Sequence, residues 1–399
     1  MKRHIPSRWF ILSAVAVCLV SHSPAGERNT GAWNLKTLYQ VPEASWGEDR
    51  EGIREVYFQG EPYQGRLTRV FAYYGQPSGE GPFPAMVLIH GGGGTAFPEW
   101  VRLWTARGYA AIAMDLAGCG PDKKPLADGG PGQGHDMKFA TFTGENVKDM
   151  WTYHAVAAVV RAHSLLRSLE AVDAGRTGVT GISWGGYLTC IVAGVDDRFR
   201  VAVPVYGCGF LHENSVWLAD FERLGPELTA RWVAEFDPSR YLPGVRCPIL
   251  FLNGTNDFAY PLDSYRKSYQ SVPGRVDLRV EVRMPHSHHA GWAPKEIGLY
   301  VDSILKGGTS LPQLGPLKMD GTAVSAEFQA EERIVSGYLH YTADTGPWKE
   351  RHWETRDAGI AGNRVSAGLP PARPLVCYLS VTDSRGAMTG TGHVELAAE

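Results

Sequence analysis

One stretch near the middle of the chain constrains the fold more than any other. The apolar run 177–182 ends in Gly-Ile-Ser-Trp-Gly-Gly at positions 181–186, and a helix-compatible segment follows. A strand, a sharp turn and a helix in this order hold a serine in a strained conformation that requires small neighbours. The helix would begin directly after Ser183, so its dipole and the Trp184 amide would face a negative charge forming near the serine. The pattern also arises by chance in a chain with 47 glycines, so its context must decide.

Short apolar runs alternate with helix-compatible segments on both sides of Ser183. Continuous apolar runs of this length are typical of strands buried on both faces of a parallel sheet. We expect such strands at 84–90, 110–115, 201–206, 248–254 and 278–284, and helices at 99–107 and 146–169. Residues 26–80 instead show strand-like runs separated by turns, as antiparallel strands do. The alternation predicts an α/β fold with a mostly parallel sheet and helices on both faces.

Three kinds of group stand where predicted strands end. A run of four glycines from Gly91 follows the strand at 84–90, and such a loop lets backbone amides approach a ligand closely. Asp257 lies in the turn after the strand at 248–254, with Asp263 as the alternative acid. The turn after the last strand contains His286, His288 and His289.

Serine, acid and histidine in this chain order are the groups of a nucleophilic triad. A serine hydroxyl is a poor nucleophile until an imidazole accepts its proton, and a carboxylate orients that imidazole. In the α/β-hydrolase fold the three groups follow each other in this order at the carboxyl edge of the sheet. The amides of Gly91, Gly92 and Trp184 are the candidate oxyanion donors.

The segment 172–186, Val-Asp-Ala-Gly-Arg-Thr-Gly-Val-Thr-Gly-Ile-Ser-Trp-Gly-Gly, resembles α/β-hydrolases of the acetylxylan esterase, dienelactone hydrolase and prolyl oligopeptidase group. The resemblance covers roughly residues 67–305 and implies that Ser183 is the nucleophile and Asp257 the acid. Because such enzymes place the base several positions beyond the last strand, it favours His289, with His288 next. Dienelactone hydrolases typically use cysteine, so Ser183 favours ester or peptide chemistry.

Aromatic residues near the predicted strand ends are candidates for substrate binding. The insertion 210–241 often covers the active face in this topology, and Trp217 lies within it. Tyr260 and Trp292 follow the turns that carry the acid and the histidines. All three could border a cleft, although aromatic side chains at such spacing also serve as packing.

The ends of the chain indicate further segments. Residues 1–25 combine basic residues, an apolar stretch and small residues before a cleavage position, as a secretory signal peptide does, which predicts a secreted or periplasmic protein. We therefore expect a catalytic domain at 26–309. After a linker with Gly and Pro, residues 310–399 carry several strand-like runs, which predict a small accessory β-sandwich. We expect this domain to pack against the catalytic domain and stabilise it or shape a wall of the cleft; the alternative is carbohydrate binding through Trp348 and Trp353.

The charge balance, the apolar runs and the cysteines limit the kinds of partner and cross-link that this chain can have. Removing the leader takes away three basic residues and leaves 36 Lys and Arg against 42 Asp and Glu, which argues against nucleic acid. No other apolar run is long enough for a membrane span. The five remaining cysteines have no Cys-x-x-Cys pairing; a bridge between Cys119 and Cys208 is the one alternative. We expect no metal and no cofactor, and the oligomeric state is not indicated.

The hypothesis is an exported serine hydrolase that cleaves carboxylic esters, with acetylated carbohydrate as the substrate that the resemblance favours. The first alternative is a peptidase of the prolyl oligopeptidase kind, although residues 26–80 cannot form the large propeller of those enzymes. The second is a non-catalytic binding protein on the same scaffold.

Overall fold

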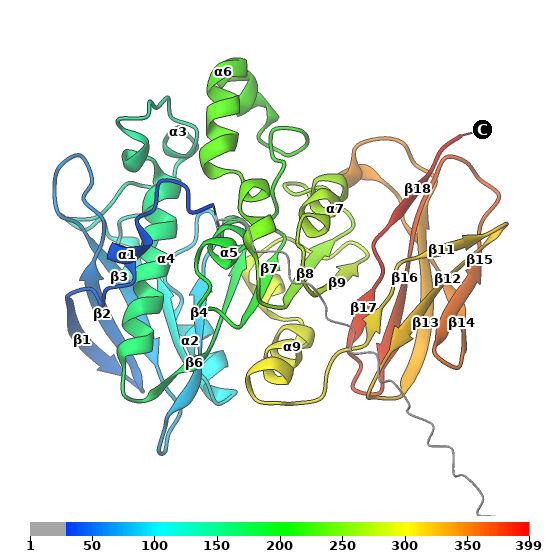
Figure 1. Ribbon diagram of the computed structural model, residues 1–399, viewed down its shortest axis with the longest axis horizontal. Coiled ribbons are helices and arrows are strands. Elements are labelled where there is room, and N and C mark those ends of the chain that lie inside the picture. The colour runs from blue at the N-terminus through cyan, green and yellow to red at the C-terminus, as the bar shows by residue number, and fades with distance from the viewer. Residues whose placement is uncertain (1–28, 399) are drawn as a thin grey trace, which may run out of the picture.

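The larger of two sheets organises residues 29–398, the part of the chain that the computed structural model describes. It has nine strands in the order β1-β2-β3-β5-β4-β6-β7-β8-β9 (Figure 1). Pairing is antiparallel from β1 to β5 and parallel from β5 to β9. The strands are β1 (Ala44–Arg50), β2 (Ile53–Gln59), β3 (Arg69–Gly75), β4 (Phe83–Ile89), β5 (Ala110–Met114), β6 (Val172–Ile182), β7 (Val201–Val205), β8 (Ile249–Gly254) and β9 (Val276–Glu281).

Helices cover both faces of this sheet, and several of them connect its parallel strands. They are α1 (Leu35–Leu38), α2 (Pro98–Ala106), α3 (His135–Lys138), α4 (Trp151–Ser168), α5 (Trp184–Val195), α6 (Leu218–Phe236), α7 (Leu262–Gln270), α8 (His288–Trp292) and α9 (Lys295–Leu305). Neighbouring residues of a strand point to opposite faces. In β6, Thr180 faces a hollow between α2 and α9, whereas Gly181 lies against α5. The predicted mostly parallel sheet with helices on both faces is confirmed.

The segment 210–241, predicted as an insertion over the active face, contains the bent helix α6 (Figure 1). The bend lies at Gly225, whose φ of 74° leaves the helical region, and Pro226 follows it without an amide hydrogen to donate. Phe221 and Trp232 bury their rings against the body of the molecule. These two side chains are therefore packing residues.

The second sheet spans residues 313–396 and is antiparallel throughout. Its strands are β10 (Gln313–Leu314), β11 (Lys318–Asp320), β12 (Ala323–Gln329), β13 (Ile334–Thr342), β14 (Glu354–Ala361), β15 (Arg364–Gly368), β16 (Leu375–Asp383), β17 (Met388–Gly390) and β18 (Val394–Leu396). Residues 354–358 of β14 pair with β13 and residues 359–361 pair with β15, so the sheet folds over on itself. Val324, Leu339 and Leu379 lie in the enclosed core. The predicted small β-sandwich is confirmed.

The second sheet packs beside β9, the last strand of the first sheet (Figure 1). Val280 of β9 shares a buried apolar cluster with Trp348, Trp353 and Tyr378. The Tyr378 hydroxyl also donates a hydrogen bond to the carbonyl oxygen of Val280, at 3.1 Å. Because both tryptophans are buried in this interface, they cannot offer a carbohydrate platform in this structure.

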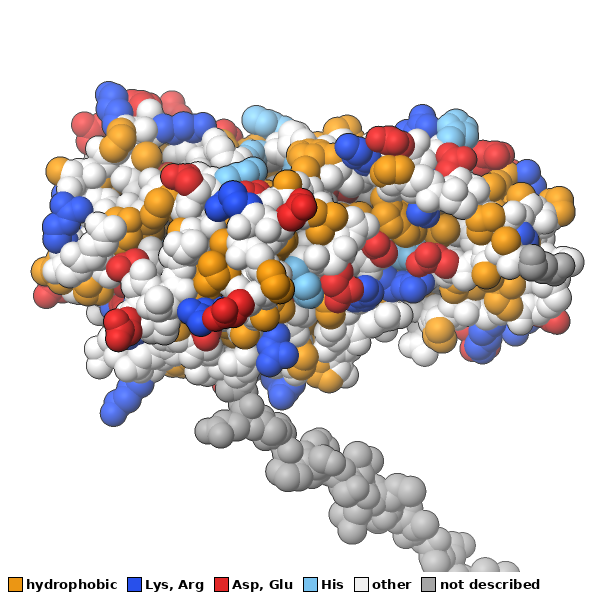
Figure 2. All heavy atoms as spheres, turned by 90° about the horizontal axis from the view of Figure 1, so that it is seen from above, with side chains coloured by type: hydrophobic (Ala, Val, Ile, Leu, Met, Phe, Trp, Pro, Cys, Tyr) orange, Lys and Arg blue, Asp and Glu red, His pale blue; other side chains and the backbone are white. Residues whose placement is uncertain are grey.

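The helices and the surface charges bear on the predicted absence of membrane and nucleic-acid partners. Within residues 29–398, no helix combines the length and the apolar character that crossing a membrane would require. On the face shown in Figure 2, acidic and basic side chains are interspersed rather than gathered by sign. That distribution differs from the basic stripe that nucleic-acid-binding proteins present. The predicted leader 1–25 lies outside the described residues.

Candidate active site

Ser183 lies in the tight turn between β6 and α5. Its φ of 60° and ψ of −118° are unfavourable for a residue with a side chain. Backbone bonds hold it there, because its amide donates to the Val205 carbonyl at 2.9 Å and its carbonyl accepts from Tyr187 at 2.9 Å. A Cβ atom at Gly185 would overlap the carbonyl oxygen of Ile89. The turn thus requires glycine there, as the motif predicted.

A hydrogen-bonded chain connects Ser183, His286 and Asp257. The Ser183 hydroxyl donates to Nε2 of His286 at 2.9 Å, and Nδ1 of His286 donates to Oδ2 of Asp257 at 2.6 Å. An imidazole with its proton on Nδ1 satisfies both contacts and leaves Nε2 as the acceptor. Serine, imidazole and carboxylate stand in the order that lets the imidazole accept the hydroxyl proton.

The prediction of His289 as the base is wrong, because His286 occupies that position. His289 is exposed and packs against the ring of Trp292, with ring centres 4.8 Å apart. The error has a structural cause. β9 ends at Glu281 rather than near position 284, so His286 is the histidine that lies several residues beyond the strand.

The carboxylate of Asp257 is buried and fully engaged. Its second oxygen, Oδ1, accepts the amides of Ala259 at 2.9 Å and Tyr260 at 2.8 Å. These bonds fix the carboxylate relative to its own loop, so the loop backbone decides where Oδ2 meets the imidazole. The alternative acid, Asp263, instead accepts the side-chain amide of Asn214 at 2.8 Å, and Asp257 is the carboxylate bonded to His286.

Aromatic rings hold the His286 imidazole. Tyr206 stacks on it with ring centres 4.3 Å apart, and the Tyr206 hydroxyl donates to the carbonyl oxygen of Pro285 at 2.6 Å. Phe258 lies 4.8 Å from the imidazole and is 53% exposed. Phe258 was missed by the sequence reasoning, although its place directly after the predicted acid was a usable signal. Its ring is an exposed apolar surface directly beside the imidazole.

The loop Gly91–Gly94 lies against the serine turn, with one difference from prediction. The amide of Gly91 donates to Nε2 of His288 at 2.9 Å, so it is not free to bind an oxyanion. Burial lowers the pKa of His288 to about 4, which keeps the imidazole neutral and able to accept this bond. Gly92, which lies against the Trp184 ring, and the Trp184 amide remain the candidate donors.

Side chains from the segment 121–138 hold the same loop. The Lys123 ammonium donates to the Gly93 carbonyl at 2.8 Å, and the Gln133 amide donates to the Gly94 carbonyl at 3.2 Å. Lys138 is 2% exposed, donates to the Gln133 carbonyl at 2.5 Å and lies 4.7 Å from the centre of the Trp184 ring. Desolvation lowers the pKa of Lys138 to about 8.

The three predicted substrate-binding residues have different positions. Tyr260 is 0% exposed and Trp217 is 4% exposed; their rings contact each other, and Trp217 also contacts Trp184. Both support the site from inside the molecule, so the prediction that they border a cleft is wrong for this structure. Trp292 is half-buried and packs on Phe97.

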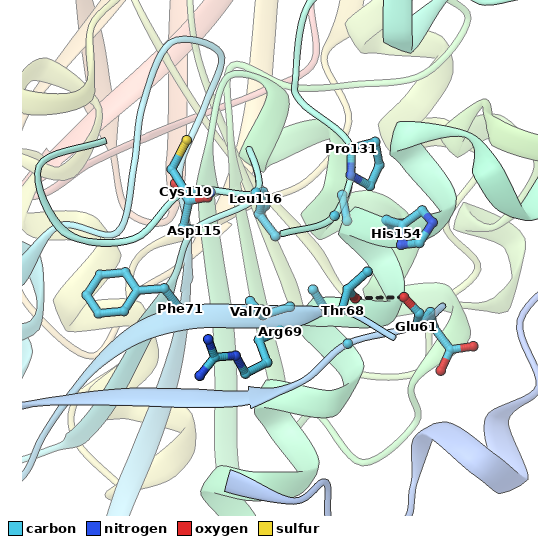
Figure 3. Close-up of a pocket in the computed structure, with 15 residues that line it drawn as sticks. Glu61, Thr68, Arg69, Val70, Phe71, Asp115, Leu116, Cys119, Pro131 and His154 are labelled. Carbon is cyan, nitrogen blue, oxygen red and sulfur yellow. Dashed lines mark hydrogen bonds between the residues drawn. The ribbon is translucent and has the colours of Figure 1, made fainter. Parts of the chain in front are cut away.

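The cavity in Figure 3 is not part of this site. It lies between β3, the end of β5 and α4, and its lining includes Thr68, Asp115 and His154 but no triad residue. Its volume of about 30 Å³ accommodates a water molecule rather than a substrate. His154 Nε2 has no hydrogen-bond partner among the described residues, and a water in this cavity would provide one.

The described residues contain neither a metal-binding cluster nor a disulfide bond. Residues 29–398 contain no cluster of three or more His, Cys, Asp or Glu side chains arranged to hold a metal ion. The five cysteines in that range are free thiols, including Cys119 and Cys208, so the alternative bridge between these two is wrong.

Comparisons with known proteins place this chain among similar hydrolases and esterases. A family model described as acetyl xylan esterase (AXE1) matches residues 39–227. The uncharacterized peptidase YuxL of Bacillus subtilis is 26% identical over 231 residues, 54% of this chain and 32% of that protein. The acetyl esterase Axe7A of Xylanibacter ruminicola is 24% identical over 208 residues, 49% of this chain and 47% of that protein. The chain thus spans less than half the length of either curated relative.

Among solved structures, the acetyl xylan esterase of a Paenibacillus species superposes with a TM-score of 0.51 at 24% identity. The match covers 63% of this chain and 87% of that structure. At this identity the likeness shows a shared fold, which extends over most of the neighbour.

Proposed function

We propose that this chain is a serine hydrolase that cleaves carboxylic esters, of the group that includes acetylxylan esterases, dienelactone hydrolases and prolyl oligopeptidase-like enzymes; the family match over residues 39–227 and an acetyl esterase among its relatives support the proposal. The observation that carries the proposal is the hydrogen-bonded chain from Ser183 through His286 to Asp257. A non-catalytic binding protein would have no need for this chain or for the strained backbone of Ser183.

The first half of the proposed reaction forms an acyl-enzyme. Ser183 Oγ attacks the ester carbonyl carbon while His286 Nε2 takes the hydroxyl proton, and Asp257 stabilises the resulting imidazolium. The carbonyl oxygen becomes an oxyanion, which accepts hydrogen bonds from the amides of Gly92 and Trp184. When the intermediate collapses, the bond to the alcohol oxygen breaks and His286 returns the proton to that oxygen. The alcohol leaves, and the acyl group stays on Ser183.

The second half repeats these steps with water. His286 Nε2 takes a proton from the water as its oxygen attacks the acyl carbon. Collapse of the second intermediate breaks the bond to Ser183 Oγ, which regains the proton from His286. The carboxylic acid is released and the free enzyme is restored.

Acetylated carbohydrate is the substrate that we propose within this class. Two observations support it: the matching family model carries the description acetyl xylan esterase, and one relative is an acetyl esterase. Export through the leader at 1–25 would bring the enzyme to polysaccharides outside the cytoplasm. Amino-terminal sequencing of the protein isolated from culture fluid or periplasm tests this step, because cleavage after Ala25 predicts a chain that begins at Gly26.

A peptidase is the second candidate, because one relative bears the name peptidase. The test compares p-nitrophenyl acetate and longer acyl esters with aminoacyl and prolyl p-nitroanilides, using Ser183→Ala as the blank. Rapid acetate release that Ser183→Ala abolishes supports the esterase. Anilide cleavage without comparable ester turnover supports the peptidase, and the absence of Ser183-dependent turnover on every substrate contradicts both.

A further inference from the structure

We propose that the second sheet completes the active site: its turn 344–353 holds the two loops that carry Asp257 and His286, and Asn256 is the positioning residue that connects them. The inference rests on the proposed function, because it assigns a role in the same reaction. It gives the C-terminal part of the chain a task beyond covering the β9 edge.

The first contact fixes the acid loop. The side-chain amide of Asn256 donates to the carbonyl oxygen of Arg351 at 2.7 Å and to those of Trp348 and Lys349 at 3.2 Å each. Two amide protons serve three acceptors, so one of them is shared. Because Asn256 directly precedes Asp257, this attachment fixes the backbone from which the carboxylate extends.

The second contact brings in the loop that carries the base. The Thr255 hydroxyl donates to Oδ1 of Asn256 at 2.7 Å and accepts the backbone amide of Arg283 at 3.0 Å. Arg283 adopts a φ of 57°, which an arginine maintains only when its surroundings hold it. Its guanidinium also lies 2.9 Å from Nδ1 of His352, in the same turn of the second sheet. Both catalytic loops are therefore fastened to one segment.

The turn 344–353 is itself well supported. The Asp344 carboxylate accepts the backbone amide of His352 at 2.6 Å, and the Arg351 guanidinium donates to the Gly346 carbonyl at 2.8 Å. That guanidinium lies 3.8 Å from the centre of the Trp348 ring, which is buried in the interface between the sheets. The carbonyl oxygens that accept the Asn256 amide thus belong to a turn that its own hydrogen bonds and the buried Trp348 ring hold in place.

The geometry of Asp257 explains why this attachment matters for catalysis. Its Oδ1 is bound by amides of its own loop, so a displacement of the loop displaces Oδ2 from His286 by the same amount. A misplacement of about 1 Å can lower an enzymatic rate about 100-fold. Asn256 touches neither Ser183 nor the oxyanion loop, so substrate binding should change little.

The experiment measures p-nitrophenyl acetate hydrolysis by full-length Asn256→Ala, with active sites counted by fluorophosphonate labelling of Ser183. We expect kcat per labelled site to fall about 10- to 100-fold while KM stays within about twofold. The downfield proton NMR signal of the His286 Nδ1–H bonded to Asp257 should weaken or vanish. Asn256→Asp keeps the shape but removes both donors, so its loss should be at least as large.

Two further variants complete the design. Thr389→Val removes a hydroxyl that donates to the Pro312 carbonyl at 2.7 Å, a buried bond of the second sheet that touches neither catalytic loop, and should leave kcat unchanged. His352→Ala changes an exposed side chain, should fold normally, and should lower kcat in the same direction by a smaller factor. If the Asn256 variants do not fold, the kcat of His352→Ala tests the positioning role in their place.

The outcomes separate the two proposals. Wild-type kcat in both Asn256 variants, or a raised KM at unchanged kcat, overturns the positioning role while leaving the esterase intact. If only His352→Ala folds, an unchanged kcat in that variant likewise overturns the positioning role and leaves the esterase proposal intact. If the wild-type protein shows no Ser183-dependent turnover, the proposed function fails, and the His286 proton signal alone still tests whether Asn256 holds the acid.

Discussion

His286 and His289 lie three positions apart in different surroundings. His286 bridges Ser183 and Asp257, whereas His289 is exposed against Trp292. We expect His286→Ala to lower kcat/KM for p-nitrophenyl acetate about 10⁴-fold, because no other described group accepts the hydroxyl proton. His289→Ala is the matched control and should stay within about twofold. Comparable losses in both variants would contradict the assignment.

The buried Lys138 should make the free energy of unfolding depend on pH. Its pKa is about 8 in the folded protein and near 10.5 when unfolded, so between these values the unfolded chain binds more protons. The free energy of unfolding should therefore rise with pH across this window, by on the order of 3 kcal/mol from this residue.

Urea unfolding of the wild type and Lys138→Met between pH 7 and 10.5 measures this effect as a difference, in which other titrating groups cancel. The wild type should gain stability relative to the variant as pH rises through 8 to 10.5. A difference that stays constant with pH would show that burial does not perturb the lysine.

At the scale of elements, the junction of β6 and α5 depends on a glycine that packs against β4. A methyl group at Gly185 would overlap the backbone oxygen of Ile89, which cannot move without disturbing the central sheet. Gly185→Ala should lower the free energy of unfolding by more than about 3 kcal/mol. Gly274→Ala is the control, because a Cβ there meets no atom within 4 Å. Equal midpoints in denaturant for the two variants would refute this account.

The end of one strand decided how well the site could be predicted. Buried apolar runs located the strands, and serine, acid and histidine loops followed in the expected order. However, 278–284 looks strand-like throughout, and nothing in that run indicates that pairing stops at Glu281. The three-residue difference shifted the predicted base from His286 to His289. Strand ends depend on hydrogen bonds to neighbouring strands, which local sequence does not encode.

At the scale of the whole molecule, the two sheets should unfold together. Trp348 and Trp353 are buried between them, and Asn256 and Tyr378 add hydrogen bonds across the same boundary. Differential scanning calorimetry should show one cooperative transition. Trp348→Ala should lower the free energy of unfolding of the protein by about 3–5 kcal/mol. The control is Leu67→Ala, whose side chain is 70% exposed, and it should change that free energy by less than about 0.5 kcal/mol. Two separate transitions would contradict this coupling.

The sequence predicted two folded parts and a second part that packs against the first, but not which residues make the contact. Alternating strands and helices indicated the first part, and short strands with turns indicated the second. Asn256 and Arg351 are 95 positions apart, and neither lies in a pattern that indicates a partner. The buried positions of Trp348 and Trp353 were missed for the same reason, since an aromatic residue in a strand-rich segment suits a binding face and a packed interface equally.

The attachment of Asn256 has a consequence for biosynthesis. A ribosome completes the serine, the acid and the base long before it reaches residues 344–353, which hold the last two in register. A nascent or prematurely terminated chain would carry every reacting group and still hydrolyse slowly. Full catalytic power would then require that the second sheet has folded against the first, and not only that the three reacting groups have been made.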